Sequence, residues 1–472
     1  MIEFDKLYIN GEWVKPHSDE LMEVINPSTG EIAGIVPMGT KEDVDVAVNA
    51  ATIALSSWSE TSIEERCNIL QKCSSALKEL ENKFAQTITD EVGTPIGFSK
   101  MAMVGTPRVV FKSYAKILEH FEFEEEIGNS LVVKEPVGVC GFITPWNFPL
   151  HQIVGKVAPA LAAGCTMILK PSKIAPLNAF LLAEVMHEIG LPAGVFNLVH
   201  GHGTSVGEHI ASHSEIDMLS FTGSTQAGVR VAKLAADSVK RVTLELGGKS
   251  ANIILEDADL VKAVRNGVNA CYSNSGQTCS ALTRMIVPRK LKEEVIEIVK
   301  GSVQRYTVGD PNQEGTKCGP MISKSQYDKV RSYIQSGIDE GATLIAGGLE
   351  HPKGLENGFF VTPTAFADVT NDMTIAKEEI FGPVLCIIAY DTMDEAIAIA
   401  NDSEYGLSGG IWSEDVEKAK MLARKIKTGQ ISINGGFFNI YAPFGGYKKS
   451  GNGRELGKYG LEEFLEIKAM QF

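Results

Sequence analysis

Apolar and polar residues alternate at the start of the chain and then change to helical spacing. The segment LYINGEWV places Asn10-Gly11 between alternating residues, which predicts a β-hairpin. Residues 41–58 and 62–90 are predicted to be two helices. The second helix has one apolar face, because apolar residues recur at intervals of three and four: Leu70, Cys73, Leu77, Leu80 and Phe84. We interpret the cysteines of this face, Cys67 and Cys73, as buried packing residues.

From residue 137 onwards, short apolar strands alternate with helices. The predicted strands are 137–143, 166–170, 195–201, 218–224 and 241–248, and the predicted helices between them are 150–163, 177–189, 204–212 and 225–236. This order is typical of βαβ units, so it predicts an α/β fold with a doubly wound parallel sheet. Cys140 and Cys165 belong to the predicted core of this sheet.

A second strand-and-helix series begins after residue 250. It comprises strand 251–255, a helix ending near 274, strand 284–288 and helix 291–305, which predicts a second α/β domain with a boundary near 249–251. The strand-like segments 129–136 and 462–472 belong to neither series. Their pattern leaves two partners open, namely each other or another subunit.

Composition and charge exclude several functional classes. The net charge of −15 disfavours nucleic-acid binding, which needs an excess of Lys and Arg. The eight cysteines include no Cys-x-x-Cys pair, and no His-Glu-x-x-His occurs, so neither a disulfide framework nor a metal site is expected. The acidic start is unlike a signal peptide, and the uncharged apolar run 157–169 is too short to span a membrane. We therefore expect a cytoplasmic protein without a membrane partner.

The turns that follow the first five strands have the composition of a ligand site. Parallel sheets bind ligands at the carboxyl ends of their strands. The turns TPWNFPL, PSKIAP, GHGTSVG, TGSTQAG and ELGGKS are all rich in Gly, Pro, Ser or Thr. None matches a strict dinucleotide or phosphate-loop fingerprint, so a nucleotide site and ordinary helix caps are both consistent with them. The strongest candidate is the turn with Gly223 and Ser224, where a cap could sit beside an anion.

Three residues near these turns are candidates for catalysis. Cys279 lies among small neighbours in NSGQTCSA, which leaves room for a substrate, although most free cysteines only pack. Glu245 ends a strand predicted to be central, where burial would make its carboxylate a general base; the alternative is a solvated surface carboxylate. Asn147 is either a turn residue or an amide donor to an oxyanion.

Taken together, these stretches resemble the NAD(P)-dependent aldehyde dehydrogenase superfamily. The resemblance covers nearly the whole chain through ITPWNFPL, LKPS, FTGST, LELGGKS, GQTC, EEIFGPV and PFGGYKKSGNGRELG, in that order. It implies a Rossmann-like coenzyme-binding domain (1–116 and 137–249), an α/β catalytic domain (250–448) and a small β oligomerisation element (117–136 and 449–472). It also implies a homodimer or homotetramer.

The resemblance implies a role for each candidate. Cys279 would be the nucleophile that forms a thiohemiacetal and then a thioester, and Asn147 with the main-chain N–H of Cys279 would form the oxyanion hole. Glu245 would activate the hydrolytic water, which favours hydrolysis over transfer to coenzyme A. The rival interpretations are a cofactor-independent thiol esterase and a catalytically silent member of the family.

The resemblance also implies a cofactor site and a substrate tunnel. NAD is the default cofactor, and NADP is the alternative because Lys173 stands where many NAD-preferring relatives have Glu. The expected cofactor-binding residues are Thr144, Pro145, Trp146, Asn147, Lys170, Ser172, Lys173, Gly203, Gly207, Phe221, Thr222, Gly223, Ser224, Leu246, Glu379 and Phe381. The expected tunnel residues are Phe148, His151, Thr278, Phe438 and Phe444. Gly155 and Ser273 replace aromatics common in relatives, which predicts a wider or less apolar tunnel, and no Arg is placed to bind a substrate carboxylate.

Overall fold

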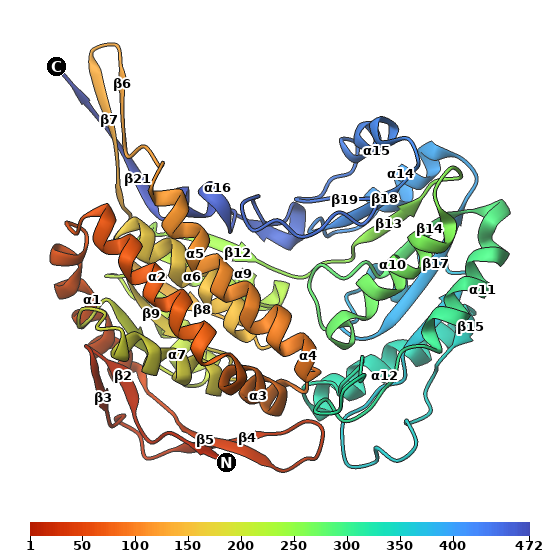
Figure 1. The fold of residues 1–472 in the computed structure, drawn as a ribbon, viewed down its shortest axis with the longest axis horizontal. Helices are drawn as coiled ribbons and strands as arrows, with labels where there is room; N and C mark the ends of the chain where they lie inside the picture. The colour runs from red at the N-terminus through yellow and green to blue at the C-terminus, as the bar shows by residue number, and fades with distance from the viewer.

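The computed structural model describes residues 1–472 as two lobes with a projecting arm (Figure 1). The first lobe is built on an eight-stranded sheet with the order β20-β12-β11-β8-β9-β10-β2-β3. Five of its strands run parallel to one another: β8 (Val139–Ile143), β9 (Thr166–Lys170), β10 (Phe196–Leu198), β11 (Met218–Thr222) and β12 (Arg241–Glu245). The edge strands β2 (Leu7–Ile9), β3 (Glu12–Val14) and β20 (Gly451–Asn452) are antiparallel to their neighbours.

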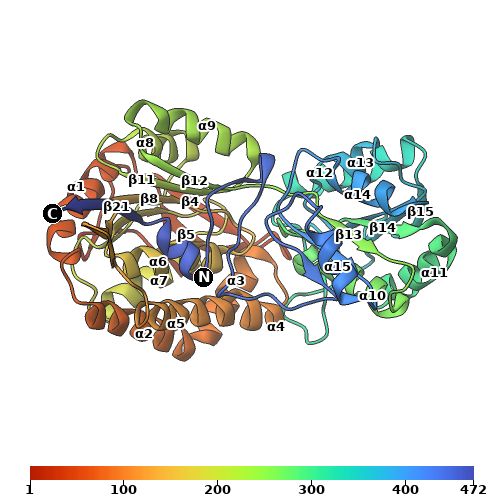
Figure 2. The same ribbon diagram turned by 90° about the horizontal axis from the view of Figure 1, so that it is seen from above.

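The helices that connect these strands cover both faces of the sheet, which confirms the doubly wound α/β fold. The chain steps outwards through β8, β9 and β10 and then returns to the other side of β8 for β11 and β12. As a result α6 (Pro149–Ala163) and α7 (Leu177–Glu188) lie on one face, and α8 (Glu208–Ser212) and α9 (Thr225–Ala235) lie on the other (Figure 2). The reversal between β8 and β11 is the position where such sheets bind ligands.

Of the two helices predicted near the N-terminus, one has the predicted bounds and the other does not. Helix α1 (Lys41–Trp58) has the predicted bounds. The predicted helix 62–90 is wrong as a single element, because it divides into α2 (Ile63–Glu79) and α3 (Glu81–Val92). Leu80 between them has φ −95° and ψ 12°, outside the helical range. No Gly or Pro marks this break, and the apolar spacing continues through it unchanged. The sequence pattern therefore gave no sign that the helix ends at Leu80.

The connection from α3 to the first parallel strand passes beside the site described below. It comprises α4 (Ile96–Phe98), a wide π-helical turn over Ser99–Gly105, and α5 (Thr106–Leu118). Helices α2 and α5 pack on each other and on α6. Cys67, Cys73, Cys140 and Cys165 all lie in the large apolar core of this lobe, which confirms their interpretation as packing residues.

The second lobe contains a seven-stranded sheet. Its order is β15-β16-β17-β14-β13-β18-β19, and all neighbours are parallel except the edge pair β15–β16. The strands are β13 (Ala251–Ile254), β14 (Arg284–Pro288), β15 (Thr343–Ala346), β16 (Thr364–Ala367), β17 (Val384–Tyr390), β18 (Gly409–Trp412) and β19 (Ser432–Ile433). The helices are α10 (Leu260–Tyr272), α11 (Lys292–Val303), α12 (Lys324–Asp339), α13 (Thr374–Lys377), α14 (Met393–Asn401) and α15 (Val416–Ala423). The chain passes from the first sheet to the second between the end of β12 at Glu245 and the start of β13 at Ala251.

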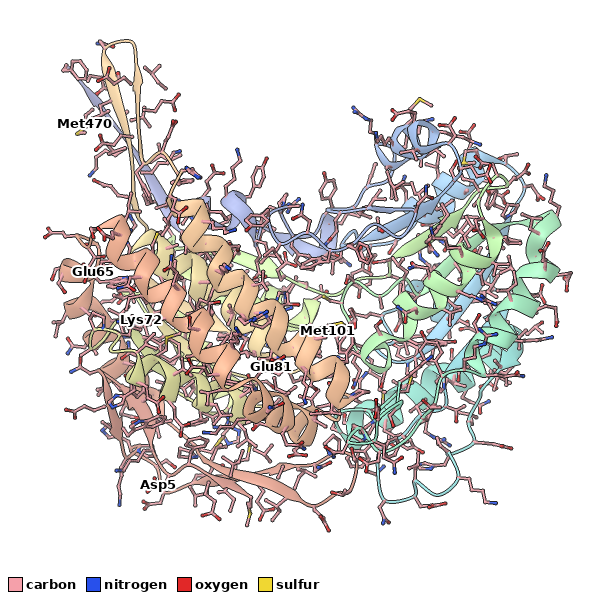
Figure 3. The ribbon with its side chains drawn as sticks, in the orientation of Figure 1. Asp5, Glu65, Lys72, Glu81, Met101 and Met470 are labelled. Carbon is pink, nitrogen blue, oxygen red and sulfur yellow. The ribbon has the colours of Figure 1, made fainter.

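The arm is a three-stranded sheet that combines two distant parts of the chain. It is formed by β6 (Glu124–Ile127), β7 (Ser130–Pro136) and β21 (Leu465–Gln471), and β21 pairs antiparallel with β7 from Leu465↔Pro136 to Gln471↔Ser130. The two segments that belonged to neither series therefore pair with each other. Figure 3 places Met470 on this arm, outside the body of the molecule.

Two further features complete the fold. A small sheet of β1 (Ile2–Glu3), β5 (Ile32–Pro37) and β4 (Leu21–Ile25) was not predicted. After β19 the chain returns from the second lobe across the first, through β20 and α16 (Gly457–Glu462), to the arm (Figure 1). None of the helices combines the length and the apolar character that crossing a membrane requires.

Candidate active site

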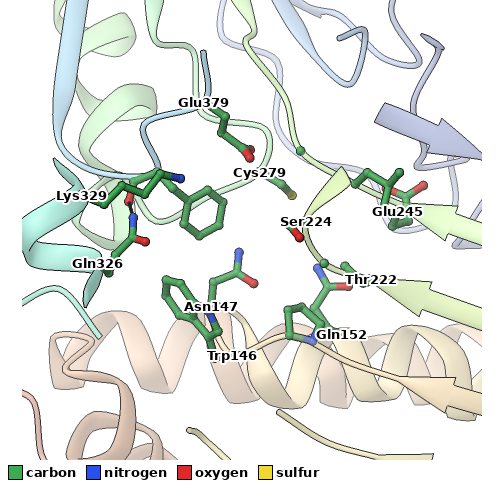
Figure 4. Close-up of a pocket in the computed structure, with 15 residues that line it drawn as sticks. Trp146, Asn147, Gln152, Thr222, Ser224, Glu245, Cys279, Gln326, Lys329 and Glu379 are labelled. Carbon is green, nitrogen blue, oxygen red and sulfur yellow. Dashed lines mark hydrogen bonds between the residues drawn. The ribbon is translucent and has the colours of Figure 1, made fainter. Parts of the chain in front are cut away.

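The carboxyl ends of the central strands face a cleft between the two lobes (Figure 4). The turn after β8, the β11–α9 junction and the end of β12 line one side of it. The second lobe supplies Cys279 together with residues of α12 and of the turn before β17. Eleven residues expected to be catalytic or to bind cofactor line this cleft: Pro145, Trp146, Asn147, Thr222, Gly223, Ser224, Glu245, Leu246, Cys279, Glu379 and Phe381.

The loop that carries Cys279 has a tightly constrained main chain. Asn274, Ser275 and Gly276 are consecutive residues with left-handed φ values of 51°, 56° and 73°. The Asn274 side chain donates to the carbonyl of Asn147 at 2.9 Å, and Ser275 Oγ donates to the carbonyl of Gly319 at 3.0 Å. The polar residues before Cys279 therefore fix the position of its thiol. The sequence had predicted only that the small neighbours of Cys279 leave room for a substrate.

Asn147 is anchored to the same loop. Its Nδ2 donates to the carbonyl of Gln277 at 3.1 Å, and Gln277 Oε1 accepts the N–H of Ile322 at 2.9 Å. A primary amide has two N–H donors, so one is left for another acceptor. Figure 4 shows the Asn147 and Cys279 side chains pointing into the same space, which is the arrangement an oxyanion site requires.

The Cys279 thiol is accessible, but its surroundings favour the protonated form. Seven of the eight cysteines are buried, and Cys279 alone is partly exposed. Burial raises the pKa of its thiol above the ordinary value, and the carboxylates of Glu245, Glu379 and Glu455 raise it further. The N–H of Ser280 opposes this rise only in part. The sequence indicated that only the fold or the cofactor could lower the pKa of the Cys279 thiol. The fold by itself raises this pKa.

Glu245 is a buried carboxylate without hydrogen-bond partners. Only 5% of its surface is exposed, and neither carboxylate oxygen has a partner. Burial raises the pKa of Glu245 well above its ordinary value, and the nearby carboxylate of Glu455 adds to this effect. The alternative of a solvated carboxylate is therefore wrong, and the carboxylate has the raised basicity of a general base.

The position of Glu245 in the sheet corrects a second expectation. Strand β12 is not central, because only the two-residue strand β20 lies beyond it. The burial of Glu245 comes from the returning C-terminal segment, in which Gly451 pairs with Glu245 and Gly445 approaches its carboxylate. A Cβ at Gly451 would overlap the main chain of Leu244, so this close pairing needs glycine.

The remainder of the cleft is shaped to accept an extended ligand. Ser224 Oγ accepts the N–H of Ala227 at 3.3 Å and caps α9, so the N-terminus of this helix borders the cleft. Glu379 accepts the N–H of Gly248 at 2.9 Å. The Phe381 ring stands edge-on to Trp146 with ring centres 5.4 Å apart. The Phe381 main chain has a positive φ of 60°, and Gln326 holds it by donating to its carbonyl at 2.8 Å.

Seven of the expected cofactor residues lie outside the cleft lining: Thr144, Lys170, Ser172, Lys173, Gly203, Gly207 and Phe221. They lie at the ends of the neighbouring strands or in the turns that follow them. Lys170 is buried and donates to the carbonyl of Pro171 at 3.1 Å. Burial lowers the pKa of Lys170 to about 8, and exposed Lys173 contributes to this shift. Two cationic side chains thus lie together at the end of β9.

A second cavity of about 290 Å³ also has Cys279 in its wall. All five expected tunnel residues line it: Phe148, His151, Thr278, Phe438 and Phe444. Gly155 and Ser273 are not among the lining residues, and the expected widening of the tunnel stays a prediction. Gly155 lies behind the wall against Glu455, and Ser273 lines a separate cavity beside Tyr306.

Several residues of the site were missed in the sequence. Gln152 borders both cavities, Glu455 borders the tunnel, and Gln326 and Lys329 of α12 line the cleft. Gln152 lies one helical turn after Phe148, so helical spacing could have indicated it. Lys156 is buried, pairs with Glu455 and donates to Thr222 Oγ1 at 2.7 Å. No sequence signal links Lys156 to Glu455, which lies 299 residues away.

Comparison with known proteins agrees with this geometry. Residues 13–470 match the model of the aldehyde dehydrogenase family. The chain is 51% identical to a 3-succinoylsemialdehyde-pyridine dehydrogenase of Pseudomonas sp., over 100% of this chain and 99% of that protein. An aldehyde dehydrogenase C mutant from Pseudomonas syringae, solved with NAD+ and octanal, is 48% identical with a TM-score of 0.98, covering 99% of this chain and 96% of that one. A Mycobacterium tuberculosis aldehyde dehydrogenase with NAD+ is 44% identical with a TM-score of 0.97, covering 100% and 98%.

Proposed function

The chain belongs to the aldehyde dehydrogenase family, and we propose that it oxidises an aldehyde to the carboxylic acid through a thioester on Cys279. The observation that carries this proposal is the position of Cys279. It is the one partly exposed thiol, and it lies in the walls of both the cleft and the aromatic tunnel. A substrate entering through the tunnel could therefore react at the sulfur while a hydride acceptor occupies the cleft.

The first step forms a covalent bond to the substrate. The Cys279 thiolate adds to the aldehyde carbon, and the carbonyl oxygen becomes an oxyanion. The free N–H of the Asn147 amide and the main-chain N–H of Cys279 donate to that oxygen. The product is a thiohemiacetal whose carbon still carries the aldehyde hydrogen.

The second half of the reaction releases the acid. A nicotinamide cofactor held in the cleft would supply the hydride acceptor, and loss of the hydride from the substrate carbon would leave the substrate as a thioester on Cys279. Glu245 removes a proton from water, and the resulting hydroxide attacks the thioester carbon. The carbon–sulfur bond breaks, the acid leaves, and Cys279 returns as the thiolate.

The cleft fits a dinucleotide in its chemistry. The N-terminus of α9 and the small residues Gly223 and Ser224 suit a phosphate group, and Glu379 is an acceptor for ribose hydroxyls. Phe381 and Trp146 offer aromatic surface for a planar ring. Both relatives solved with NAD+ support NAD as the default. Lys170 and Lys173 lie where a carboxylate would repel a 2′-phosphate. Because lysines do not repel this group, NADP is the alternative cofactor.

The tunnel favours an uncharged aldehyde with an apolar or aromatic body. The rings of Phe438 and Phe444 lie 6.1 Å apart, and Phe438 lies 6.3 Å from His151. No Lys or Arg lines the tunnel, and Glu455 does, so an anionic substrate finds no cation there. One relative is named for a pyridine-bearing semialdehyde, which suggests an aryl-bearing aldehyde as the substrate. Another relative was solved with octanal, which suggests a medium-chain aliphatic aldehyde.

The test is the absorbance of the reduced cofactor with a panel of aldehydes. We expect turnover of aryl and aliphatic aldehydes that exceeds turnover of carboxylate-bearing ones, and none with Cys279→Ala. The assay is run with NAD and with NADP, and Lys173→Glu should weaken NADP selectively if Lys173 binds the 2′-phosphate. Ester hydrolysis at full rate without cofactor would favour the thiol esterase. No reaction of the folded protein under any condition would favour a catalytically silent member.

A further inference from the structure

Three potential metal ligands meet on the face of the first sheet that carries α8, away from the cleft. Asp45 lies in α1, His209 lies in α8, and His213 follows immediately after that helix. Figure 2 shows α1 and α8 in the part of the first lobe that is remote from the second lobe. Their ligand atoms all lie within 4.8 Å of one another. His209 Nε2 is 2.6 Å from Asp45 Oδ1, and His213 Nε2 is 3.4 Å from the same oxygen. None of these side chains has a part in the proposed oxidation.

The chemistry of the three ligands suits a borderline divalent ion. Two imidazole nitrogens and one carboxylate oxygen are ligands for Zn²⁺, Ni²⁺ or Cu²⁺, whereas Mg²⁺ and Ca²⁺ prefer oxygen alone. With bonds of about 2.1 Å, tetrahedral coordination separates ligand atoms by about 3.4 Å. The His213–Asp45 separation already has this value. The His209–Asp45 hydrogen bond needs to open by less than about 1 Å as the ion replaces its proton.

The surroundings permit binding and supply a favourable charge. Asp45 is 54% exposed, and His209 and His213 are 25% and 14% exposed, so an ion and a water ligand can enter from solvent. Glu42 adds negative charge near His209 and Glu215 adds it near His213, while Lys240 adds positive charge near His213.

Binding would replace the His209–Asp45 hydrogen bond by metal–ligand bonds and would break one further, weaker interaction. His213 Nδ1 accepts the N–H of Glu215 at 3.2 Å. Ligation through Nε2 leaves the ring proton on Nδ1, so this long hydrogen bond must break. The cost is small beside two metal–imidazole bonds and one metal–carboxylate bond.

We propose that Asp45, His209 and His213 bind one divalent transition-metal ion, such as Zn²⁺, which joins α8 to α1. The ion would be held by three side chains and completed by water. It would also fix the turn over Gly203–Gly207, because α8 continues directly from that turn.

The test is calorimetric titration of the full chain with ZnCl₂ and, separately, with NiCl₂. It is done in the Cys279→Ala background, so that the accessible thiol cannot capture the metal. We expect one equivalent to bind, and His209→Ala or His213→Ala to weaken the affinity at least about tenfold. The unfolding temperature should rise with metal in the parent protein and not in the two variants.

His17→Ala is the matched control. His17 also pairs with a carboxylate, with Nδ1 2.7 Å from Asp43 Oδ1, but no second histidine adjoins it. It should leave the titration unchanged. The proposal is overturned if one-equivalent binding persists when both His209 and His213 are alanine. It is also overturned if the parent protein takes up neither metal, or if His17→Ala weakens binding as much as His209→Ala.

Discussion

At the residue scale, the surroundings of the two groups proposed to react both favour the protonated form. Burial and neighbouring carboxylates raise the pKa of the Cys279 thiol and of Glu245. The proposed reaction needs the deprotonated form of each group, because the thiolate would attack the aldehyde and the carboxylate would take a proton from water. In this proposal, the environment that makes Glu245 basic would also lower the fraction of enzyme that is ready to react.

This arrangement predicts that turnover increases with pH. Below its pKa, the deprotonated fraction of each group rises about tenfold per pH unit, so kcat should increase from about pH 6 to about pH 9. The measurement is the pH profile of kcat and of the first-turnover burst. In Glu245→Gln the burst should keep its dependence on pH through Cys279. A profile that is flat or that falls with rising pH would contradict these assignments.

The oxyanion role of Asn147 predicts a specific kinetic defect. Asn147→Ala should lower kcat about 10²- to 10³-fold, because the lost N–H stabilises charge that develops in the transition state. KM should change much less. Since Asn147 also anchors Gln277, thermal unfolding of the variant must be compared with that of the parent. A variant as stable as the parent and nearly as active would exclude this role.

At the scale of elements, the loop before Cys279 depends on its left-handed residues. Gly276→Ala combines a φ of 73° with overlap between the new Cβ and the main chain of Gly382. We expect a loss of stability of more than about 1 kcal/mol and a larger loss of activity, because the thiol moves with the loop.

Gly301→Ala in α11 is the matched control for this prediction. Gly301 is exposed, lies within a helix and has open space around its Cα, so alanine there should stabilise the protein slightly. Thermal unfolding and activity of the two variants give the comparison. Equal stability of Gly276→Ala and the parent would contradict the predicted strain.

Local patterns predicted most elements and only part of the site. Alternating apolar strands and helices indicated both sheets, and the turns at the strand ends indicated Asn147, Glu245 and Ser224. The helix break at Leu80 was missed because leucine is a common residue within helices and does not indicate a break. Strand β20 and Glu455 were missed because they reach the site from the far end of the chain. The three proposed metal ligands could not be found from the sequence for the same reason, since Asp45 lies 164 residues before His209.

At the scale of the whole molecule, the arm has the character of an interface. Its two outer strands carry exposed apolar side chains, namely Ile127 (56%) in β6 and Ile467 (71%) and Met470 (43%) in β21. Exposed apolar surface on a projecting sheet is typical of contact between subunits. The domain ranges and the homodimer or homotetramer expected from the sequence stay predictions, and the arm is where they can be tested.

Charge on the arm should therefore disrupt assembly. Ile467→Glu with Met470→Glu should shift the mass measured by light scattering towards the monomer, because two buried carboxylates would oppose the contact. Ile53→Glu is the control, since Ile53 is 67% exposed on α1 and lies outside the arm. A shift caused equally by Ile53→Glu, or no shift with the arm variant, would place the interface elsewhere.

The most direct test of the proposed chemistry is a single turnover of Glu245→Gln with aldehyde and NAD, followed by intact mass. Without the base, hydride transfer should proceed and hydrolysis should stall. We predict a burst of about one equivalent of reduced cofactor per chain and a protein mass increased by the acyl group, with neither seen in Cys279→Ala. Steady turnover of Glu245→Gln at the rate of the parent protein, without an acyl adduct, would contradict the thioester mechanism and the role of Glu245.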